Sequence, residues 1–190
     1  MIEIAYEDSE EVTQVKVNGD DGKYAVIVKT EKKQDVMVTV KKKGHAFDTK
    51  LIAKEEFEKE DVAVRDKDLS VRKLKVGEAY TIKEILYATN SASLTTSSKF
   101  ILRGFARFLR ENPTLTVSIQ GHTDDVGDDA ENLDLSERRA KGVEKYIQSL
   151  GIGAHRLSAK GYGESMPKVE NISSFNRSQN RRTDFFIEGL

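Results

Sequence analysis

"LTVSIQGHTDDVGDDAENLDLSERRA" (residues 115–140) joins an alternating segment to a charged loop and the beginning of a helix. Apolar and polar side chains alternate over residues 115–121, which is the period of a strand with one face toward a core. Several acidic side chains follow, and then the adjacent Arg138 and Arg139. Carboxylates accept hydrogen bonds and guanidinium groups donate them, so this mixture is either a site for chemistry or recognition, or only a solvated surface.

A helix is predicted over residues 97–112, on the amino-terminal side of this strand. Apolar residues recur there at helical spacing, at Ile101, Phe105, Phe108 and Leu109. We expect Ser97 or Ser98 to act as the N-cap and Pro113 to stop the helix, because proline disfavours helical geometry in the residue before it.

The remaining segments of the second half predict an alternation of strands and helices. The second helix is expected to continue to about Leu150 and to end at Gly151. Strand-like composition occurs in residues 80–88, 156–163 and 181–188. This order requires crossover connections, and it predicts an α+β fold in which helices lie on one face of a sheet.

The first half, residues 1–76, is rich in predicted strands and has no convincing long helix. Residues 24–30 and 36–44 are β-branched and are bounded by turn signals, such as "NGDDG" at residues 18–22. Several short strands of this kind predict a small antiparallel β-sandwich. The charged segment 51–68 is expected at the surface. The change of pattern near residues 75–78 predicts a second domain over residues 77–190.

Composition excludes several classes of protein. The 190 residues include 31 Lys and Arg against 32 Asp and Glu, so the basic surplus of a general nucleic-acid binder is missing. Cysteine is absent, which excludes disulfides and thiolate metal sites. No apolar run is long enough to span a bilayer, and no secretory signal pattern opens the chain. Since the chain begins directly with strand-like residues, we expect it to be part of a longer protein.

Three groups of motifs in the second half point to one family. They are "IKEILYATNSASL" at residues 82–94, "GHTD" at 121–124 with its helix, and "GYGE" at 161–164 followed by "NRR" at 180–182. Residues 77–190 therefore resemble OmpA-like peptidoglycan-associated domains. The resemblance implies a βαβαβ sandwich with two helices on a mixed sheet. It also implies non-covalent binding of peptidoglycan through the meso-diaminopimelate of the stem peptide, with neither enzymatic activity nor a cofactor.

The resemblance assigns roles to individual residues of this chain. Asp124 would accept hydrogen bonds from the ammonium of diaminopimelate, and Arg139 would bind its terminal carboxylate. Asn132 and Asn90 would be polar wall residues, and Arg181 a second basic group. A lysine-type stem lacks the terminal carboxylate and would leave the arginine unpaired, which gives a basis for selectivity.

Two further details come from the same resemblance. Val126 would contribute to the site through its backbone alone. The family often has an acidic residue after the aromatic residue that ends its first strand, and this chain has Ala88 there, after Tyr87. The missing carboxylate changes the expected lining of the site at that position and does not affect the Asp124 and Arg139 pair.

Helical geometry gives a separate reason to choose Arg139 over Arg138. At roughly 100° per residue, Arg139 falls in the middle of an apolar side of the second helix, and Arg138 falls at its edge. That apolar side comprises Leu135, Val143, Tyr146, Ile147 and Leu150. A guanidinium on an apolar face needs a partner. The partner is either a ligand carboxylate beside Asp124 or an internal acid.

Metal binding and catalysis fit the charged loop poorly. Val126 and Gly127 interrupt the alternating oxygen ligands that a calcium loop needs, so no metal site is predicted. The remaining acids Asp125, Asp128 and Asp129 are expected to be solvated, and His122 is expected to make a structural hydrogen bond. No constellation of nucleophile and base is visible, so no enzyme is predicted. The open alternative is an assembly module that keeps the fold and has lost the ligand.

The first half has a resemblance of its own, carried by "DGKY" at residues 21–24 and "KGHAF" at 43–47. Residues 18–47 resemble carboxypeptidase-regulatory-like domains, which are transthyretin-like sandwiches, and no catalytic set is present in them. Together, the two resemblances predict an exported protein in the periplasm, associated with the outer membrane. Its expected partners are peptidoglycan and other envelope proteins, without nucleic acid.

Overall fold

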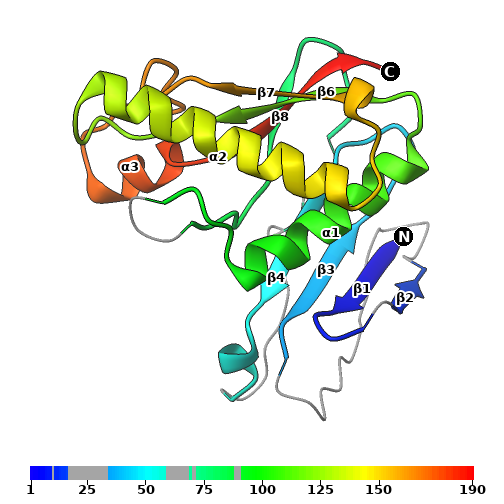
Figure 1. The fold of residues 1–190 in the computed structure, drawn as a ribbon. Coiled ribbons are helices and arrows are strands. Elements are labelled where there is room, and N and C mark those ends of the chain that lie inside the picture. The colour runs from blue at the N-terminus through cyan, green and yellow to red at the C-terminus, as the bar shows by residue number, and fades with distance from the viewer. Residues whose placement is uncertain (10, 17–33, 59–68, 70–71, 88–90) are drawn as a thin grey trace. The chain divides into compact units, whose positions relative to one another are not determined.

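The computed structural model describes residues 1–9, 11–16, 34–58, 69, 72–87 and 91–190 (Figure 1). The chain divides into two compact units, Met1–Lys73 and Leu74–Leu190. This division lies close to the predicted boundary between residues 76 and 77. Within the described residues, no helix is both long enough and apolar enough to cross a membrane.

The first unit contains a four-stranded antiparallel sheet in the order β2-β1-β3-β4. Its elements are β1 (Ile2–Tyr6), β2 (Val12–Val15), β3 (Val36–Val40), β4 (Asp48–Ile52) and the short 3-10 helix η1 (Lys54–Glu58). The core beneath this sheet is formed by Ile2, Ile4, Val36, Val38 and Ile52. The strand predicted from residue 36 is confirmed. The turn predicted at residues 18–22 and the strand at 24–30 lie outside the described residues, so the sandwich stays a prediction.

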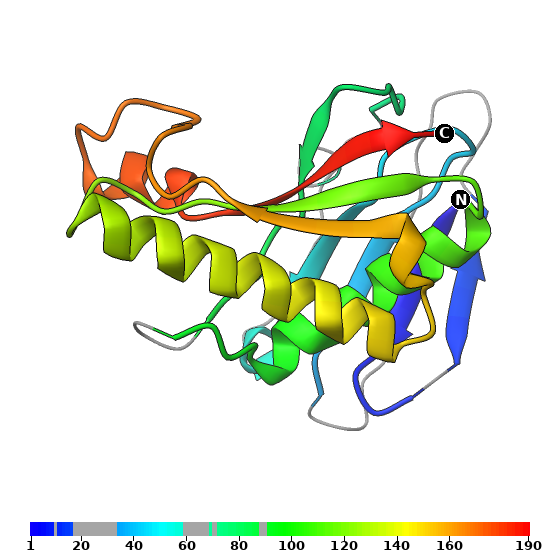
Figure 2. The ribbon, with the colours of Figure 1, turned by 45° about the horizontal axis from the view of Figure 1, so that its top comes forward.

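The second unit is built on a mixed sheet in the order β5-β8-β6-β7, in which only β6 and β7 are parallel. Its strands are β5 (Ala79–Thr81), β6 (Thr116–Gly121), β7 (Leu157–Gly161) and β8 (Thr183–Gly189). Its helices are α1 (Thr96–Glu111), α2 (Asp129–Ser149), the 3-10 helix η3 (Ala154–Arg156) and the short α3 (Ser174–Asn180). Figure 2 shows α1 and α2 on one side of the sheet, which confirms the predicted α+β architecture.

The apolar stripe of α1 is buried as predicted, but the N-cap is Thr95 and not Ser97 or Ser98. The Thr95 side chain accepts a hydrogen bond from the Ser98 amide at 3.1 Å. The Ser98 hydroxyl is already bonded to the amide and the carbonyl of Leu86, both at 2.8 Å, so it serves to hold the preceding loop.

The strand predicted over residues 80–88 is much shorter in the structure. Only β5 is regular, because Glu84 adopts a φ of 63° and turns the chain away from the sheet. Tyr87 then forms an isolated bridge with Leu94. This turn brings the Tyr87 side chain to Thr183 at the beginning of β8, where the hydroxyl groups are 3.0 Å apart.

Two glycines allow α2 to pack closely on β6 and β7. A Cβ atom on Gly121 would collide with the carbonyl oxygen of Ser136, and one on Gly161 would collide with the amide of Glu137. The Ser136 hydroxyl in turn accepts a hydrogen bond from the Gly163 amide at 2.8 Å. Larger residues at the two glycine positions would therefore lift the beginning of α2 away from the sheet.

The prediction that Arg139 lies in the middle of the buried face of α2 is wrong. The buried residues of this helix are Asn132, Ser136, Ala140, Val143 and Ile147. Arg139 is half-buried at the edge of that face. Small residues at Ser136 and Ala140 face the sheet, so the packing face is rotated relative to the one expected from apolar residues alone. Arg138 is exposed and bonds Asp134 on its own helix at 2.7 Å.

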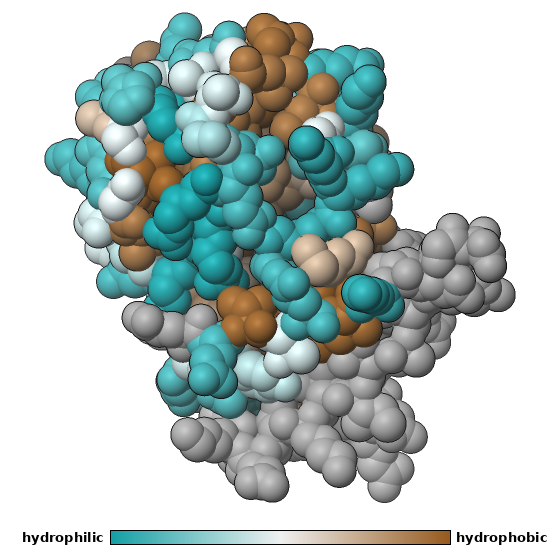
Figure 3. Space-filling view, turned by 90° about the vertical axis from the view of Figure 1, so that its right-hand side faces the viewer, coloured by the Kyte–Doolittle hydropathy of each residue, from teal (hydrophilic) through white to brown (hydrophobic). Residues whose placement is uncertain are grey.

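The surface reflects the high content of charged residues. Hydrophilic side chains cover most of the described surface in Figure 3, and smaller hydrophobic areas lie between them. This distribution is ordinary for a folded chain of which 33% of the residues are charged.

Candidate ligand-binding site

The site forms where the chain leaves β6, between the first turns of α2 and the end of α3. The chain remains tied to its neighbours after β6 ends, because His122 donates its amide to Arg182 and Thr123 donates its amide to Gly163. These bonds bring Asp124 to the carboxyl end of the strand, where its residue is only 7% exposed. The backbone therefore holds a nearly buried carboxylate in a fixed place.

Asp124 has a partner for each carboxylate oxygen. Oδ2 accepts a hydrogen bond from Arg181 at 2.5 Å, and Oδ1 accepts one from the Val126 amide at 3.3 Å. The Arg181 side chain is 49% exposed, whereas that of Asp124 is 10% exposed. Because each carboxylate oxygen can accept two hydrogen bonds, Asp124 keeps acceptor capacity for a further donor.

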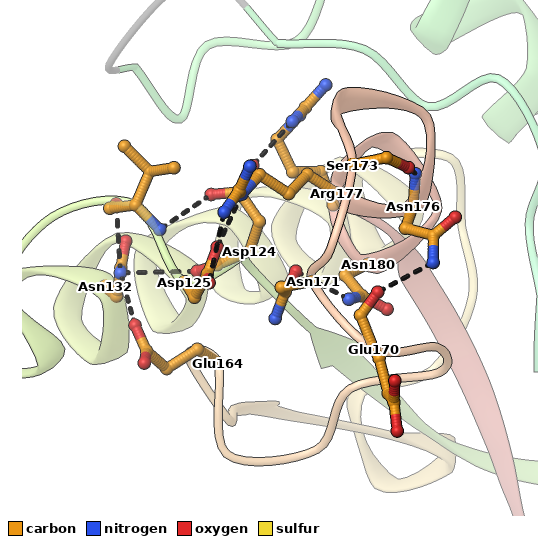
Figure 4. A network of polar contacts seen from close by, with 12 residues as sticks. Asp124, Asp125, Asn132, Glu164, Glu170, Asn171, Ser173, Asn176, Arg177 and Asn180 are labelled. Atoms are coloured by element: carbon orange, nitrogen blue, oxygen red, sulfur yellow. Dashed lines mark hydrogen bonds and ion pairs between the residues drawn. The ribbon is translucent and has the colours of Figure 1, made fainter.

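Asn132 supports the loop instead of lining an open wall. Its amide nitrogen donates to the carbonyl oxygens of Asp124 and Val126, at 3.4 and 3.2 Å, and to the Glu164 carboxylate at 2.8 Å (Figure 4). The residue is 7% exposed. The backbone of Val126 is used within the loop, and its side chain is 63% exposed. Asn90, predicted as a second wall residue, lies outside the described residues.

Arg139 approaches the site from α2 with part of its guanidinium unused. Its Nε donates to the Ser91 carbonyl at 3.0 Å, and its central carbon lies 4.7 Å from the centre of the Tyr87 ring. Its two terminal nitrogens have no hydrogen bond to any described residue. Burial lowers the pKa of Arg139, and the charges of Arg138 and Arg181 act in the same direction, while Tyr87 and Asp124 oppose them. Arg139 therefore shares one electrostatic environment with Arg181 and Asp124.

Two of the acids expected to be solvated have defined roles. Asp125 accepts hydrogen bonds from Arg177 of α3 at 2.7 and 3.4 Å, and this bond is the main reason why the pKa of Asp125 lies below its ordinary value. Asp128 is the N-cap of α2 and accepts the amides of Ala130 and Glu131. Aspartate before a helix is an N-cap signal that the sequence already contained, whereas the pairing of Asp125 required the fold.

Helix α3 was missed by the sequence analysis, and Asn180 at its end holds the loop before it (Figure 4). Asn180 is fully buried, accepts the amides of Lys168 and Val169, and donates to Val169 and Asn171. These bonds fix the segment that carries Arg177 and Arg181. The short length of α3 gave no helical period to detect.

His122 does not make the expected hydrogen bond. The ring is 3% exposed, stacks on Tyr162 with centroids 5.4 Å apart, and has no hydrogen-bond partner on either nitrogen among the described residues. Its Nε2 lies 3.6 Å from the Asp184 carboxylate. Burial lowers the pKa of His122 to about 4, and the charge of Arg182 adds to this shift while Asp184 opposes it. His122 is therefore a neutral ring packed behind the site.

The described part of the chain contains no cluster of three or more His, Cys, Asp or Glu side chains that could hold a metal ion. What the fold provides is a nearly buried carboxylate, an arginine bonded to it and a second arginine whose two terminal nitrogens have no hydrogen bond to a described residue. An α+β domain with this arrangement at a strand end is a module suited to bind a small group with charges of both signs.

The chain belongs to the OmpA family, whose profile matches residues 86–181. It is 38% identical over 87 residues to outer membrane porin F of Pseudomonas fluorescens, which is 46% of this chain and 27% of the porin. It is 31% identical over 109 residues to the peptidoglycan-binding protein ArfA of Mycobacterium bovis, which is 57% of this chain and 33% of ArfA. The chain thus spans about a quarter to a third of these relatives.

A solved structure supports the same relationship. The peptidoglycan-associated lipoprotein from Burkholderia pseudomallei matches with a TM-score of 0.50 and 28% identity. The match covers 54% of this chain and 87% of the lipoprotein chain. The family match lies in the second unit, and the likeness of residues 18–47 to carboxypeptidase-regulatory-like domains stays a prediction.

Proposed function

We propose that this chain binds peptidoglycan non-covalently, through the meso-diaminopimelate of the stem peptide, and so tethers an envelope protein to the cell wall. The observation that carries the proposal is the Arg181–Asp124 ion pair together with Arg139, whose charge interacts with both and whose terminal nitrogens have no hydrogen bond to a described residue. The names of the relatives support it, since ArfA is a peptidoglycan-binding protein and the lipoprotein is peptidoglycan-associated.

The free end of diaminopimelate carries an ammonium beside a carboxylate, and the site offers a partner for each. The ammonium would use the remaining lone pairs of Asp124. The carboxylate would accept hydrogen bonds from the two unused nitrogens of Arg139, whose planar fork matches a carboxylate. Arg181 already neutralises Asp124, so we expect it to move toward the ligand carboxylate when the ammonium arrives.

The same proposal implies a cellular location for the protein and a binding role without enzymatic activity. Peptidoglycan lies outside the cytoplasmic membrane, so we place the chain in the periplasm, in association with the outer membrane and with other envelope proteins. Binding of this kind breaks no covalent bond, and we propose no enzymatic activity. A tether needs only affinity for peptidoglycan, and the pairing of Arg139 with the diaminopimelate carboxylate would make that binding selective.

An assembly module without ligand binding is the second candidate. The internal Arg181–Asp124 pair favours it, because this pair satisfies the buried carboxylate without any ligand. The unused donors of Arg139 favour peptidoglycan binding, because an assembly module has no need of a half-buried guanidinium with open hydrogen-bonding positions.

Sedimentation with purified sacculi separates the two candidates. We expect the protein to sediment with diaminopimelate-type sacculi, to be released by free meso-diaminopimelate, and to bind lysine-type sacculi at least several-fold more weakly, since one charged hydrogen-bonded group is worth roughly 1–3 kcal/mol. Equal binding to both types of sacculus would contradict recognition of the terminal carboxylate. Binding to neither would favour the assembly module.

A further inference from the structure

We propose that Tyr87 is a positioning residue that sets the direction of the Arg139 guanidinium for the ligand carboxylate. The inference rests on the function proposed above and extends it to a residue that does not itself contact the ligand. A long arginine side chain has many rotamers, and fixing one of them before binding avoids the entropic cost of ordering the side chain when the ligand arrives.

Tyr87 is fixed to the sheet on one side. Its hydroxyl lies 3.0 Å from the hydroxyl of Thr183, the first residue of β8. Thr183 is 1% exposed, and its carbonyl accepts the amide of Ile82. Burial raises the pKa of the Tyr87 hydroxyl, so the group stays protonated and hydrogen-bonded at neutral pH. The ring therefore has a defined orientation.

Arg139 lies over the face of the same ring. The guanidinium carbon lies 4.7 Å from the ring centre, a distance at which a cation is attracted to the face of an aromatic ring. The Ser91 carbonyl oxygen accepts a hydrogen bond from Nε at 3.0 Å. A ring contact and one hydrogen bond together fix the plane of the guanidinium.

This arrangement leaves a particular pair of donors available. With Nε occupied by Ser91, the remaining donors of Arg139 are its two terminal nitrogens, which have no hydrogen bond to a described residue. These two nitrogens form the end of the fork that binds both oxygens of a carboxylate. A loss of the Tyr87 ring should therefore reduce the recognition of a carboxylate and leave other contacts unaffected.

The test compares Tyr87→Leu, which removes the ring, with Tyr87→Phe, which keeps the ring and removes the bond to Thr183. Tyr146→Leu is the matched control, because Tyr146 is a half-buried tyrosine on α2 about 10 Å along the helix axis from Arg139. Thermal unfolding of each variant verifies that it is folded. The ligands are a tripeptide stem ending in meso-diaminopimelate and the same stem ending in lysine.

The measured quantity is the ratio of the two dissociation constants. We expect Tyr87→Leu to lower the preference for diaminopimelate roughly two- to fivefold by weakening that ligand alone, since a cation–aromatic contact has about this value. Tyr146→Leu should keep the preference of the original protein, and Tyr87→Phe, which keeps the ring and loses the bond to Thr183, should lower it less than Tyr87→Leu does. An equal loss for both ligands in Tyr87→Leu would show a merely structural role and would overturn the inference.

A second measurement needs no ligand. The Nε–H signal of Arg139 in an NMR spectrum can be identified by its absence in Arg139→Lys. We expect this proton to exchange slowly with water in the original protein and fastest in Tyr87→Leu, with Tyr87→Phe between the two. An unchanged signal in Tyr87→Leu would overturn the positioning role. If the original protein binds neither tripeptide, the proposed function fails, and the NMR result still decides whether Tyr87 orients Arg139.

Discussion

Arg181 bonds the carboxylate of Asp124 at 2.5 Å, across 57 residues of sequence. The two side chains differ in exposure, because the Asp124 carboxylate is nearly buried and the Arg181 guanidinium is half exposed. Loss of the ion pair would therefore leave the nearly buried Asp124 carboxylate without its cationic partner, whereas the half-exposed Arg181 guanidinium could be solvated by water. An internal cation holds the acceptor of the site in place before any ligand arrives.

This asymmetry predicts unequal effects of removing the two partners. Arg181→Ala leaves a nearly buried carboxylate without its cation, and we expect it to lower the free energy of unfolding by roughly 1–3 kcal/mol. Asp124→Asn leaves Arg181 free to turn into water and keeps an oxygen for the Val126 amide, so we expect a loss below about 1 kcal/mol. Urea unfolding measures both. A larger loss in Asp124→Asn would contradict this account of the pair.

The adjacent arginines of α2 provide a matched pair for binding. We expect Arg139→Ala to lower the affinity for diaminopimelate-type sacculi at least tenfold with a small change in melting temperature, because its terminal nitrogens have no hydrogen bond to a described residue and are proposed to bind the ligand carboxylate. Arg138→Ala should bind as the original protein does, because Arg138 is exposed and pairs with Asp134. Binding that survives the first change and is lost with the second would reverse the assignment.

The depressed pKa of His122 predicts a pH dependence of stability. The pKa is 6.5 in the unfolded chain and about 4 in the folded one. Between these values the unfolded state binds the extra proton, so the free energy of unfolding should fall as the pH falls from 6.5 toward 4, by up to about 1.4 kcal/mol per pH unit.

Unfolding of His122→Gln over the same pH range checks this contribution. We expect a shallower decline in this variant, since the titrating ring is gone. His155→Gln, at an exposed position, is the matched control for the loss of a histidine. Identical slopes in His122→Gln and the original protein would mean that another group controls the acid side.

The division of the chain predicts that residues 74–190 fold alone and keep the binding activity. The fragment should begin at Leu74, because Gly77 bonds Ile187 and Lys75 bonds the Tyr80 hydroxyl, so these residues belong to the second unit. A shorter fragment from residue 82 lacks β5 and should be less stable. Circular dichroism and sacculus sedimentation measure the two properties. An insoluble 74–190 fragment would mean that the first unit contributes to the same core.

Local patterns in the sequence determined the main elements. The alternation over residues 115–121 gave β6, and the apolar stripe of residues 101–109 gave α1, because each period directly reports which side chains face a core. The motifs from residue 82 to residue 182 indicated the family, and Gly151, with a φ of 90°, ended α2 where it was expected. Each of these features depends on residues that are close together in the sequence, so the sequence alone is enough to predict it.

Only the tertiary structure decided how these elements form a site. The pairs Arg181–Asp124 and Arg177–Asp125 join residues 57 and 52 positions apart, and no local period can specify such partners. The buried face of α2 was mispredicted because small residues face the sheet there, and the strand predicted over residues 80–88 is cut short before the turn at Glu84. Charge and amphipathicity are properties of a segment, but which charges meet depends on the path of the whole chain.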